Sequence, residues 1–191
     1  TTAGHLNRLD EIATELPWQF YSTRPMLVLA MAWRRIRRLS FAAASRLIDT
    51  AVALRDKLLA EGKLDSYAAT ALDYHIRHRQ IMLAAAQDDL SRVERDAEPL
   101  ISEIGDDEAY LSCTLLGQVI VARREFYHFH DTLKLEAEVR RALDRQGAEF
   151  ASIALKCSIV PTLMAQGKTS IARRFSEEAL ASAEQRDAEI P

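Results

Sequence analysis

The sequence RPMLVLAMAWRRIRRLSFAAASRLIDTA, residues 24–51, decides the fold. Its first half is apolar on nearly every side and begins near a proline, which suits the first turn of a helix. We therefore expect a buried helix from Met26 to Arg38. Ser40 is suited to cap a second helix, and the apolar residues after it recur with a period close to 3.6 residues. The stretch predicts one antiparallel pair of helices.

The composition of the chain favours a globular helical protein. Of its 191 residues, 48% are apolar and 28% are charged, and only six are glycine and five proline, which disfavours an all-β fold. The net charge of −3 provides no general attraction to nucleic acid. No apolar run approaches the roughly 20 residues of a membrane-spanning helix, and no secretory signal is visible. We therefore expect a cytoplasmic protein with no membrane partner, in which Cys113 and Cys157 are buried free thiols.

The pattern of the first helix pair returns along the chain. Turns between helices fall near Leu39, Gln87, Arg124 and Gly167, an irregular spacing of roughly forty residues. Such a period indicates stacked helical hairpins, because one hairpin cannot bury its own apolar face. We predict an all-α fold, a right-handed superhelical solenoid of tetratricopeptide-like antiparallel helix pairs, in a single domain over residues 1–191. An N-terminal helix and connector at 1–23 would precede four pairs, at 24–64, 65–105, 106–147 and 148–191.

Several residues of the later helices carry specific expectations. Pro99 and Pro161 fall inside helical patterns, where the missing amide hydrogen predicts a kink or a displaced helix start. The apolar periodicity predicts a helix after Arg124 that turns Phe126 inward, and a helix over residues 148–166 that turns Cys157 and Met164 inward.

The opening segments resemble a known family. LDEIATELP, residues 9–17, is followed by RPMLVLAMAW at 24–33, a short turn and the pattern F-x-x-A. Together they resemble the helical-repeat region of MalT-like, LuxR-type transcriptional regulators, which are ATP-dependent bacterial activators. The segment GAEFASIAL, which opens the last pair, is similar to the same family, while Arg38 stands where the family usually has a turn glycine. The residues that carry the resemblance are Leu16, Pro17, Arg24, Pro25, Leu27, Ala32 and Trp33.

The resemblance implies a longer protein, of which this chain would be a fragment. In such a regulator an ATPase domain lies upstream and a helix-turn-helix lies downstream. ATP would then bind only the upstream domain, and DNA only the C-terminal one. Gly167-Lys168-Thr169 matches the end of a phosphate-binding loop, but Thr162 replaces the first glycine, so we interpret it as a repeat turn. The resemblance implies that this part is a regulatory or sensor domain that binds a small-molecule effector or a protein partner and supports self-association.

Aromatic and basic side chains mark the candidate binding surface. In stacked hairpins the first helix of each pair usually lines a concave face, where peptides or small ligands bind. His75-x-x-His78 could ligate a metal ion, but no third ligand is nearby, so a polar patch with Arg77 and Arg79 is the favoured interpretation. For Trp33, packing between helices is the favoured alternative. The candidate groove consists of Trp33, Arg37, Tyr74, Arg77, His78 and Tyr110.

The first helix ends in four arginines, which have two interpretations; they are Arg34, Arg35, Arg37 and Arg38. They could bind an anion or a partner, or they could simply complement the negative end of the helix dipole, which is the favoured interpretation.

Two functional classes remain open from the sequence. One is the regulatory domain described above, and the other is a stand-alone tetratricopeptide-like adaptor that binds peptides or proteins on its concave face. An enzyme is disfavoured, because the sequence offers no nucleophile with a matching base and no set of metal ligands. We therefore expect no catalytic, metal-binding or cofactor-binding residues in this chain.

Overall fold

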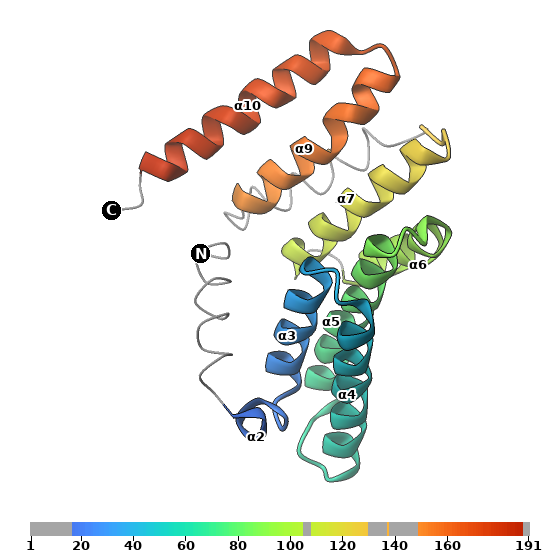
Figure 1. The fold of residues 1–191 in the computed structure, drawn as a ribbon, viewed down its shortest axis with the longest axis vertical. Coiled ribbons are helices and arrows are strands. Elements are labelled where there is room, and N and C mark those ends of the chain that lie inside the picture. The colour runs from blue at the N-terminus through green and yellow to red at the C-terminus, as the bar shows by residue number, and fades with distance from the viewer. Residues whose placement is uncertain (1–16, 105–107, 130–136, 138–148, 189–191) are drawn as a thin grey trace. The chain divides into compact units, whose positions relative to one another are not determined.

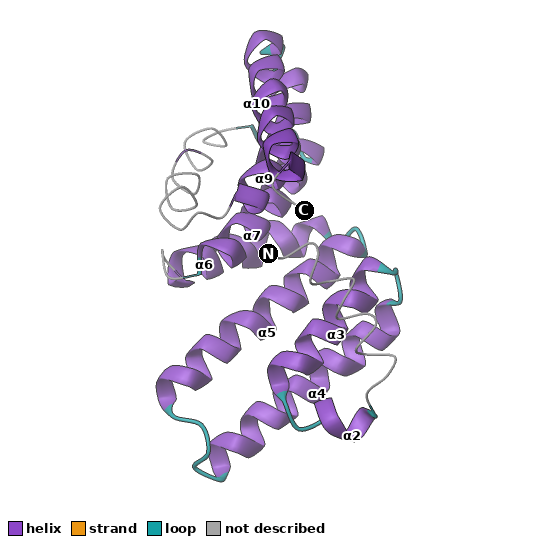
Figure 2. Ribbon diagram, turned by 90° about the vertical axis from the view of Figure 1, so that its left-hand side faces the viewer, coloured by secondary structure: helices purple, strands orange, loops and turns teal. Residues whose placement is uncertain are grey.

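A computed structural model describes residues 17–104, 108–129, 137 and 149–188, and this part of the chain is all-helical (Figures 1 and 2). No strand occurs within these ranges. The predicted all-α class is therefore confirmed, whereas the predicted helix within residues 1–16 lies outside the described residues. The helices are α2 (Trp18–Tyr21), α3 (Pro25–Arg37), α4 (Phe41–Ala60), α5 (Ser66–Ala86), α6 (Leu90–Ile104), α7 (Ala109–Glu125), α9 (Glu149–Ala165) and α10 (Thr169–Ala188).

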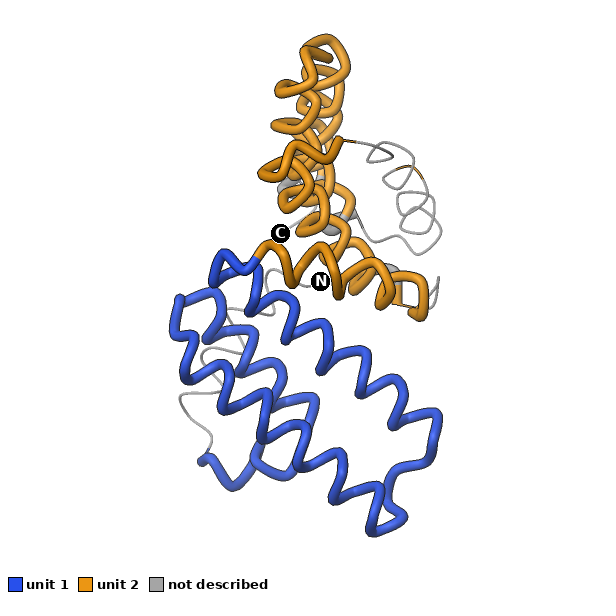
Figure 3. The backbone as a smooth tube through the Cα atoms, turned by 90° about the vertical axis from the view of Figure 1, so that its right-hand side faces the viewer, with its two compact units in different colours: residues 1–89 blue, residues 90–191 orange. Residues whose placement is uncertain are grey.

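The chain divides into two compact units, residues 1–89 and residues 90–191, coloured separately in Figure 3. The boundary falls between α5 and α6, inside the predicted helix pair at 65–105. The organisation of residues 1–191 as one domain of four pairs stays a prediction.

Unit 1 is built on three long helices that pack against one another. Each of α3, α4 and α5 contacts the other two (Figure 2). The buried positions of α4 are spaced three or four residues apart, which is the period that the sequence predicts for one helix face. The shared core consists of Val28, Leu29 and Ala32 from α3, Ile48 and Ala51 from α4, and Leu72 and Ile76 from α5.

Unit 2 is organised around α7, which packs against both α6 and α9, while α9 also packs against α10. Because α7 has neighbours on two sides, it is buried around most of its circumference. Gly117 allows α9 to approach closely, since a Cβ atom at this position would lie 3.2 Å from the Ser158 hydroxyl oxygen. The core cluster consists of Cys113, Leu116, Ile120, Leu155, Ile159, Leu163, Ala172 and Phe175.

One helix-ending geometry recurs along the chain. The second residue after the helix has a positive φ, which is 56° at Leu39, 64° at Gly62, 63° at Asp88, 59° at Tyr127 and 72° at Gly167. At each turn the amide of the following residue donates to the carbonyl five residues back, as from Ser40 to Arg35 at 2.9 Å. This is the Schellman motif, in which glycine is the usual residue. Leu39, Asp88, Tyr127 and Gly167 lie 49, 39 and 40 residues apart, whereas Gly62, between α4 and α5, falls outside that spacing. The geometry therefore marks helix ends in general, and the repeat stays a prediction.

The turn positions refine the expectations from the sequence. Leu39 and Gly167 were expected at turns and lie there, whereas the left-handed residues of the second and third turns are Asp88 and Tyr127 rather than Gln87 and Arg124. In the first turn Leu39, not Arg38, takes the conformation that usually selects glycine, because Arg38 has φ −96°.

Both internal prolines lie within continuous helices. Pro99 is inside α6 and Pro161 is inside α9, so a displaced helix start is wrong at both positions. The proline side chains are exposed, which keeps their rings out of the core.

The predicted inward faces of two helices are partly wrong. Cys157 is exposed and Met164 is 60% exposed, because the buried face of α9 is formed instead by Leu155, Ile159 and Leu163. Apolar residues surround α9, so its periodicity does not select one face. Phe126 is 38% exposed at the turn after α7, whereas Cys113 is buried as predicted. Most of the helix predicted after Arg124 lies outside the described residues.

Candidate functional site

A pocket of about 450 Å³ lies in unit 1, between the start of α3, the end of α4 and the first half of α5. These three segments meet at the same end of unit 1 (Figure 1). Its volume falls within the roughly 300–1,000 Å³ that is usual for small-molecule sites. The lining residues are Pro25, Met26, Leu58, Leu64, Tyr67, Ala68, Ala71, Leu72 and His75.

The hollow exists because α5 presents small side chains where it meets the other two helices. Ala68 and Ala71 lie three residues apart, and Leu72 and His75 continue the same helical face. Leu72 is 6% exposed and belongs to the core of the unit, so it forms the closed side of the pocket. Met26 is 49% exposed and Tyr67 is 81% exposed, and these two residues form its open rim.

His75 is the polar group on the inner side of this pocket. Burial lowers the pKa of its imidazole, and the nearby positive charge of Arg79 lowers that pKa further. The imidazole is therefore neutral at neutral pH, with one nitrogen that donates and one that accepts a hydrogen bond. None of the other lining side chains carries a charge at that pH.

A second polar cluster joins α3 to α5, around Trp33. The guanidinium of Arg79 lies 5.1 Å from the centre of the Trp33 ring, and the His78 ring lies 6.4 Å from it. Arg79 Nη1 lies 2.6 Å from His78 Nδ1. Because a guanidinium can only donate, Nδ1 accepts and the ring proton is on Nε2. Burial first, and then the charge of Arg79, holds the pKa of His78 well below its usual value of 6.5.

The position of His78 in this cluster shows that one residue of the predicted groove was wrongly assigned. His78 is 1% exposed, so it cannot line an open groove, nor does it belong to an exposed polar patch with Arg77. Trp33 is half-buried and packs against the cluster of Ile36 and Met82, which agrees with the packing alternative.

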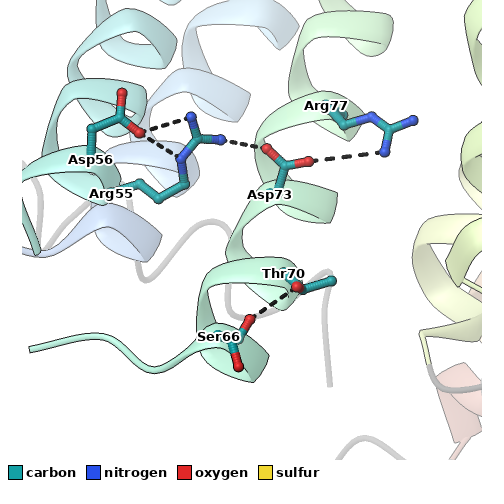
Figure 4. A network of polar contacts seen from close by, with 6 residues as sticks. All are labelled: Arg55, Asp56, Ser66, Thr70, Asp73 and Arg77. Atoms are coloured by element: carbon teal, nitrogen blue, oxygen red, sulfur yellow. Dashed lines mark hydrogen bonds and ion pairs between the residues drawn. The ribbon is translucent and has the colours of Figure 1, made fainter. Parts of the chain in front are cut away.

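Arg77 belongs to an ion-pair network between α4 and α5 (Figure 4). Its Nη1 atom lies 3.9 Å from Asp73 Oδ2, and Asp73 Oδ1 also accepts a hydrogen bond from Arg55 of α4. Arg55 in turn contacts Asp56, with 2.9 Å between Arg55 Nη2 and Asp56 Oδ1. The side chain of Arg55 is only 20% exposed, so this network ties the two helices together next to the pocket-lining face of α5.

The remaining groove residues are divided between the units. Arg37 is exposed on α3, and Tyr74 is half-buried on α5. Tyr110 belongs to unit 2, where it packs against the core cluster that contains Cys113 and Leu116. A groove formed by the whole set stays a prediction.

The described residues contain no group of three or more histidine, cysteine or acidic side chains that could hold a metal ion. None of the described helices combines the length and the apolar character needed to cross a membrane.

The sequence interpretation missed the pocket, although a signal for it is present. Ala68, Ala71 and His75 share one face of a helix, and the buried positions beside them, Leu72 and Ile76, are large and apolar. Two alanines three residues apart leave space on a helix face, and a histidine four residues after the second alanine adds one polar group to that space. This pattern indicates a hollow with one hydrogen-bonding side chain. The partners from α3 and α4 could not be assigned, because helix faces alone do not define which helix ends meet.

Comparison with protein-family models, with curated proteins and with solved structures finds no match.

Proposed function

We propose that this chain is the regulatory, effector-sensing helical-repeat region of a bacterial LuxR-type transcriptional regulator of the MalT-like kind, a solenoid of tetratricopeptide-like helix pairs. The observation that carries the repeat part of this proposal is the spacing of four Schellman turns, at Leu39, Asp88, Tyr127 and Gly167, with a fifth such turn at Gly62 between the first and second predicted pairs. Equivalent backbone turns at intervals near forty residues are typical of stacked helical hairpins.

The pocket supports the sensing part of the proposal. It offers an effector a mainly apolar surface with one hydrogen-bonding imidazole, at the junction of three helices. A ligand that binds there contacts α3, α4 and α5 together, so it would stabilise their mutual packing. In the whole regulator, which we place in the cytoplasm, that stabilisation would bias self-association, while ATP and DNA would bind outside this chain.

A stand-alone adaptor for peptides or proteins is the second candidate function. Arg35 and Arg37 favour it, because both are exposed on α3 and neither forms an ion pair within the described part of the chain. Such side chains are suited to an acidic peptide.

The complete coding sequence distinguishes the two functions. For the regulator we expect a phosphate-binding-loop ATPase before this region and a helix-turn-helix after it. A coding sequence that lacks both modules would exclude the regulator and leave the adaptor.

A further inference from the structure

We propose that the pocket of unit 1 binds an uncharged, largely apolar small molecule that makes one hydrogen bond with the imidazole of His75. The inference names the ligand class of the effector, and it rests on the proposed sensing function for its biological role.

The lining of the pocket favours a small molecule with a large apolar surface. Leu72 closes the inner side of the pocket, and its floor is continuous with the core of Val28 and Leu29. Leu58 and Leu64 flank it from the end of α4 and the following loop, whereas Tyr67 leaves its rim open. Apolar contacts with these walls would supply most of the affinity, because burial of apolar surface is the main favourable term in such sites.

The charges around the pocket favour an uncharged molecule. No lining side chain carries a charge at neutral pH, and burial together with the Arg79 charge lowers the pKa of His75, which keeps its imidazole neutral. Asp73, on the same turns of α5, is engaged by Arg55 and Arg77, and Asp65 accepts a hydrogen bond from the Ala68 amide at 2.8 Å. A carboxylate or ammonium group held against these lining side chains would therefore lose hydration without an ion-pair partner among them.

Two fluorescent probes with the same ring system test the inference on the whole 191-residue chain. Phenylnaphthylamine is uncharged and has one N–H group, whereas anilinonaphthalene sulfonate adds a negative charge. We expect saturable binding of phenylnaphthylamine and at least about ten-fold weaker binding of the sulfonate. No saturable binding of the uncharged probe would overturn the proposal, and equal binding of both probes would overturn its statement about charge.

Substitutions locate the bound probe. Ala71→Phe and Ala68→Phe fill the hollow and are expected to weaken phenylnaphthylamine binding by about ten-fold or more. Ala42→Phe is the matched control, because Ala42 is exposed near the start of α4, about 24 Å along the helix from Leu58. Binding that survives both filling substitutions, in variants whose circular dichroism and melting temperature show that they fold, would place the probe elsewhere and contradict the inference.

The hydrogen bond has its own test. His75→Leu is expected to weaken phenylnaphthylamine binding by about three- to ten-fold, and His75→Gln is expected to retain most of the affinity. Equal binding by the leucine variant and the unsubstituted chain would exclude a hydrogen bond to His75.

These outcomes are independent of the test of the proposed function. Probe binding in a protein that lacks the ATPase and helix-turn-helix modules would leave the pocket inference standing and remove the regulator. A protein that has both modules but binds no probe would leave the regulator standing and remove the pocket inference.

Discussion

At the residue scale, the turn after α3 places a large side chain where glycine is the ordinary choice. Leu39 has φ 56° and is 70% exposed, so its side chain gains little from burial while its backbone is strained. The Schellman hydrogen bonds from Leu39 and Ser40, both 2.9 Å long, hold it in this conformation. Tyr127, with φ 59° and 81% exposure, occupies the equivalent turn after α7. At both turns the hydrogen bonds that end the preceding helix therefore hold a large exposed side chain in the left-handed conformation.

Replacement of Leu39 by glycine is expected to stabilise the protein. Glycine removes the left-handed penalty of about 1–2 kcal/mol, part of which is offset by its larger backbone entropy in the unfolded chain. We expect the free energy of unfolding in urea to rise by about 0.5–1 kcal/mol for Leu39→Gly, and Tyr127→Gly to act in the same direction.

The matched control for this prediction is Leu180→Gly. Leu180 is 60% exposed but lies inside α10, where glycine is expected to cost about 1 kcal/mol. A loss of stability in the Leu39→Gly variant would mean that the leucine side chain contributes more than the strain costs.

At the element scale, the contact between α7 and α9 depends on the absence of a side chain at Gly117. An added Cβ would lie 3.2 Å from Ser158 Oγ and 3.8 Å from Ser158 Cβ, so the hydroxyl group is the obstacle. That hydroxyl donates to the Ala154 carbonyl at 3.1 Å, which limits its freedom to turn away. Alanine at position 117 therefore gains helix propensity and loses packing.

A double-mutant cycle measures this conflict. Alanine is worth about 1 kcal/mol more than glycine inside a helix, and we expect Gly117→Ala to realise that gain only when Ser158→Ala removes the hydroxyl. The coupling between the two substitutions should be about 1 kcal/mol in the free energy of unfolding.

Ser176→Ala provides the control for the cycle, because the Ser176 hydroxyl makes the same kind of bond, to the Ala172 carbonyl at 3.0 Å, on α10. Gly117→Ala and Ser176→Ala should be additive. If Gly117→Ala and Ser158→Ala are also additive, α9 accommodates the added Cβ atom without a loss in the free energy of unfolding.

The sequence predicts the helices better than their faces. The first helix is predicted from Met26 to Arg38 and observed from Pro25 to Arg37, because an apolar run and a proline suited to the first turn agree there. The face of α9 is misjudged at Cys157 and Met164, because a helix that is apolar on all sides has no preferred direction. The burial of His78 was missed because it depends on how two helices pack against each other. Its neighbours Trp33 and Arg79 come together only when α3 packs on α5.

At the scale of the whole molecule, buried imidazoles link stability to pH. His78 has a pKa well below 6.5 in the folded protein because of burial and then of Arg79, and the pKa of His75 is lowered for the same two reasons. The unfolded chain therefore binds more protons than the folded one as the pH falls below 6.5. Stability from these groups is fully present above that pH and is lost as the pH falls toward their folded pKa values.

We expect the free energy of unfolding to fall below pH 6.5, with His78 contributing at most about 1.4 kcal/mol per pH unit. Urea unfolding at a series of pH values should show a smaller slope for His78→Gln, even if that variant is less stable throughout. His128→Gln is the control, because His128 is an exposed histidine beside Glu94, at 2.9 Å between Nδ1 and Oε1. If the slope is unchanged in His78→Gln, the pKa of His78 is the same in the folded and the unfolded chain, which would contradict this prediction.

The left-handed turns also bear on how related chains can be recognised. Leucine, aspartate, tyrosine and glycine all occupy the same backbone position, so the hydrogen-bond pattern repeats where the residue letters do not. Two proteins built on this architecture could share every turn and almost no residue at the turns. Alignment by backbone geometry, with the positive φ values as fixed markers, would pair their helices where alignment by residue type has nothing to match.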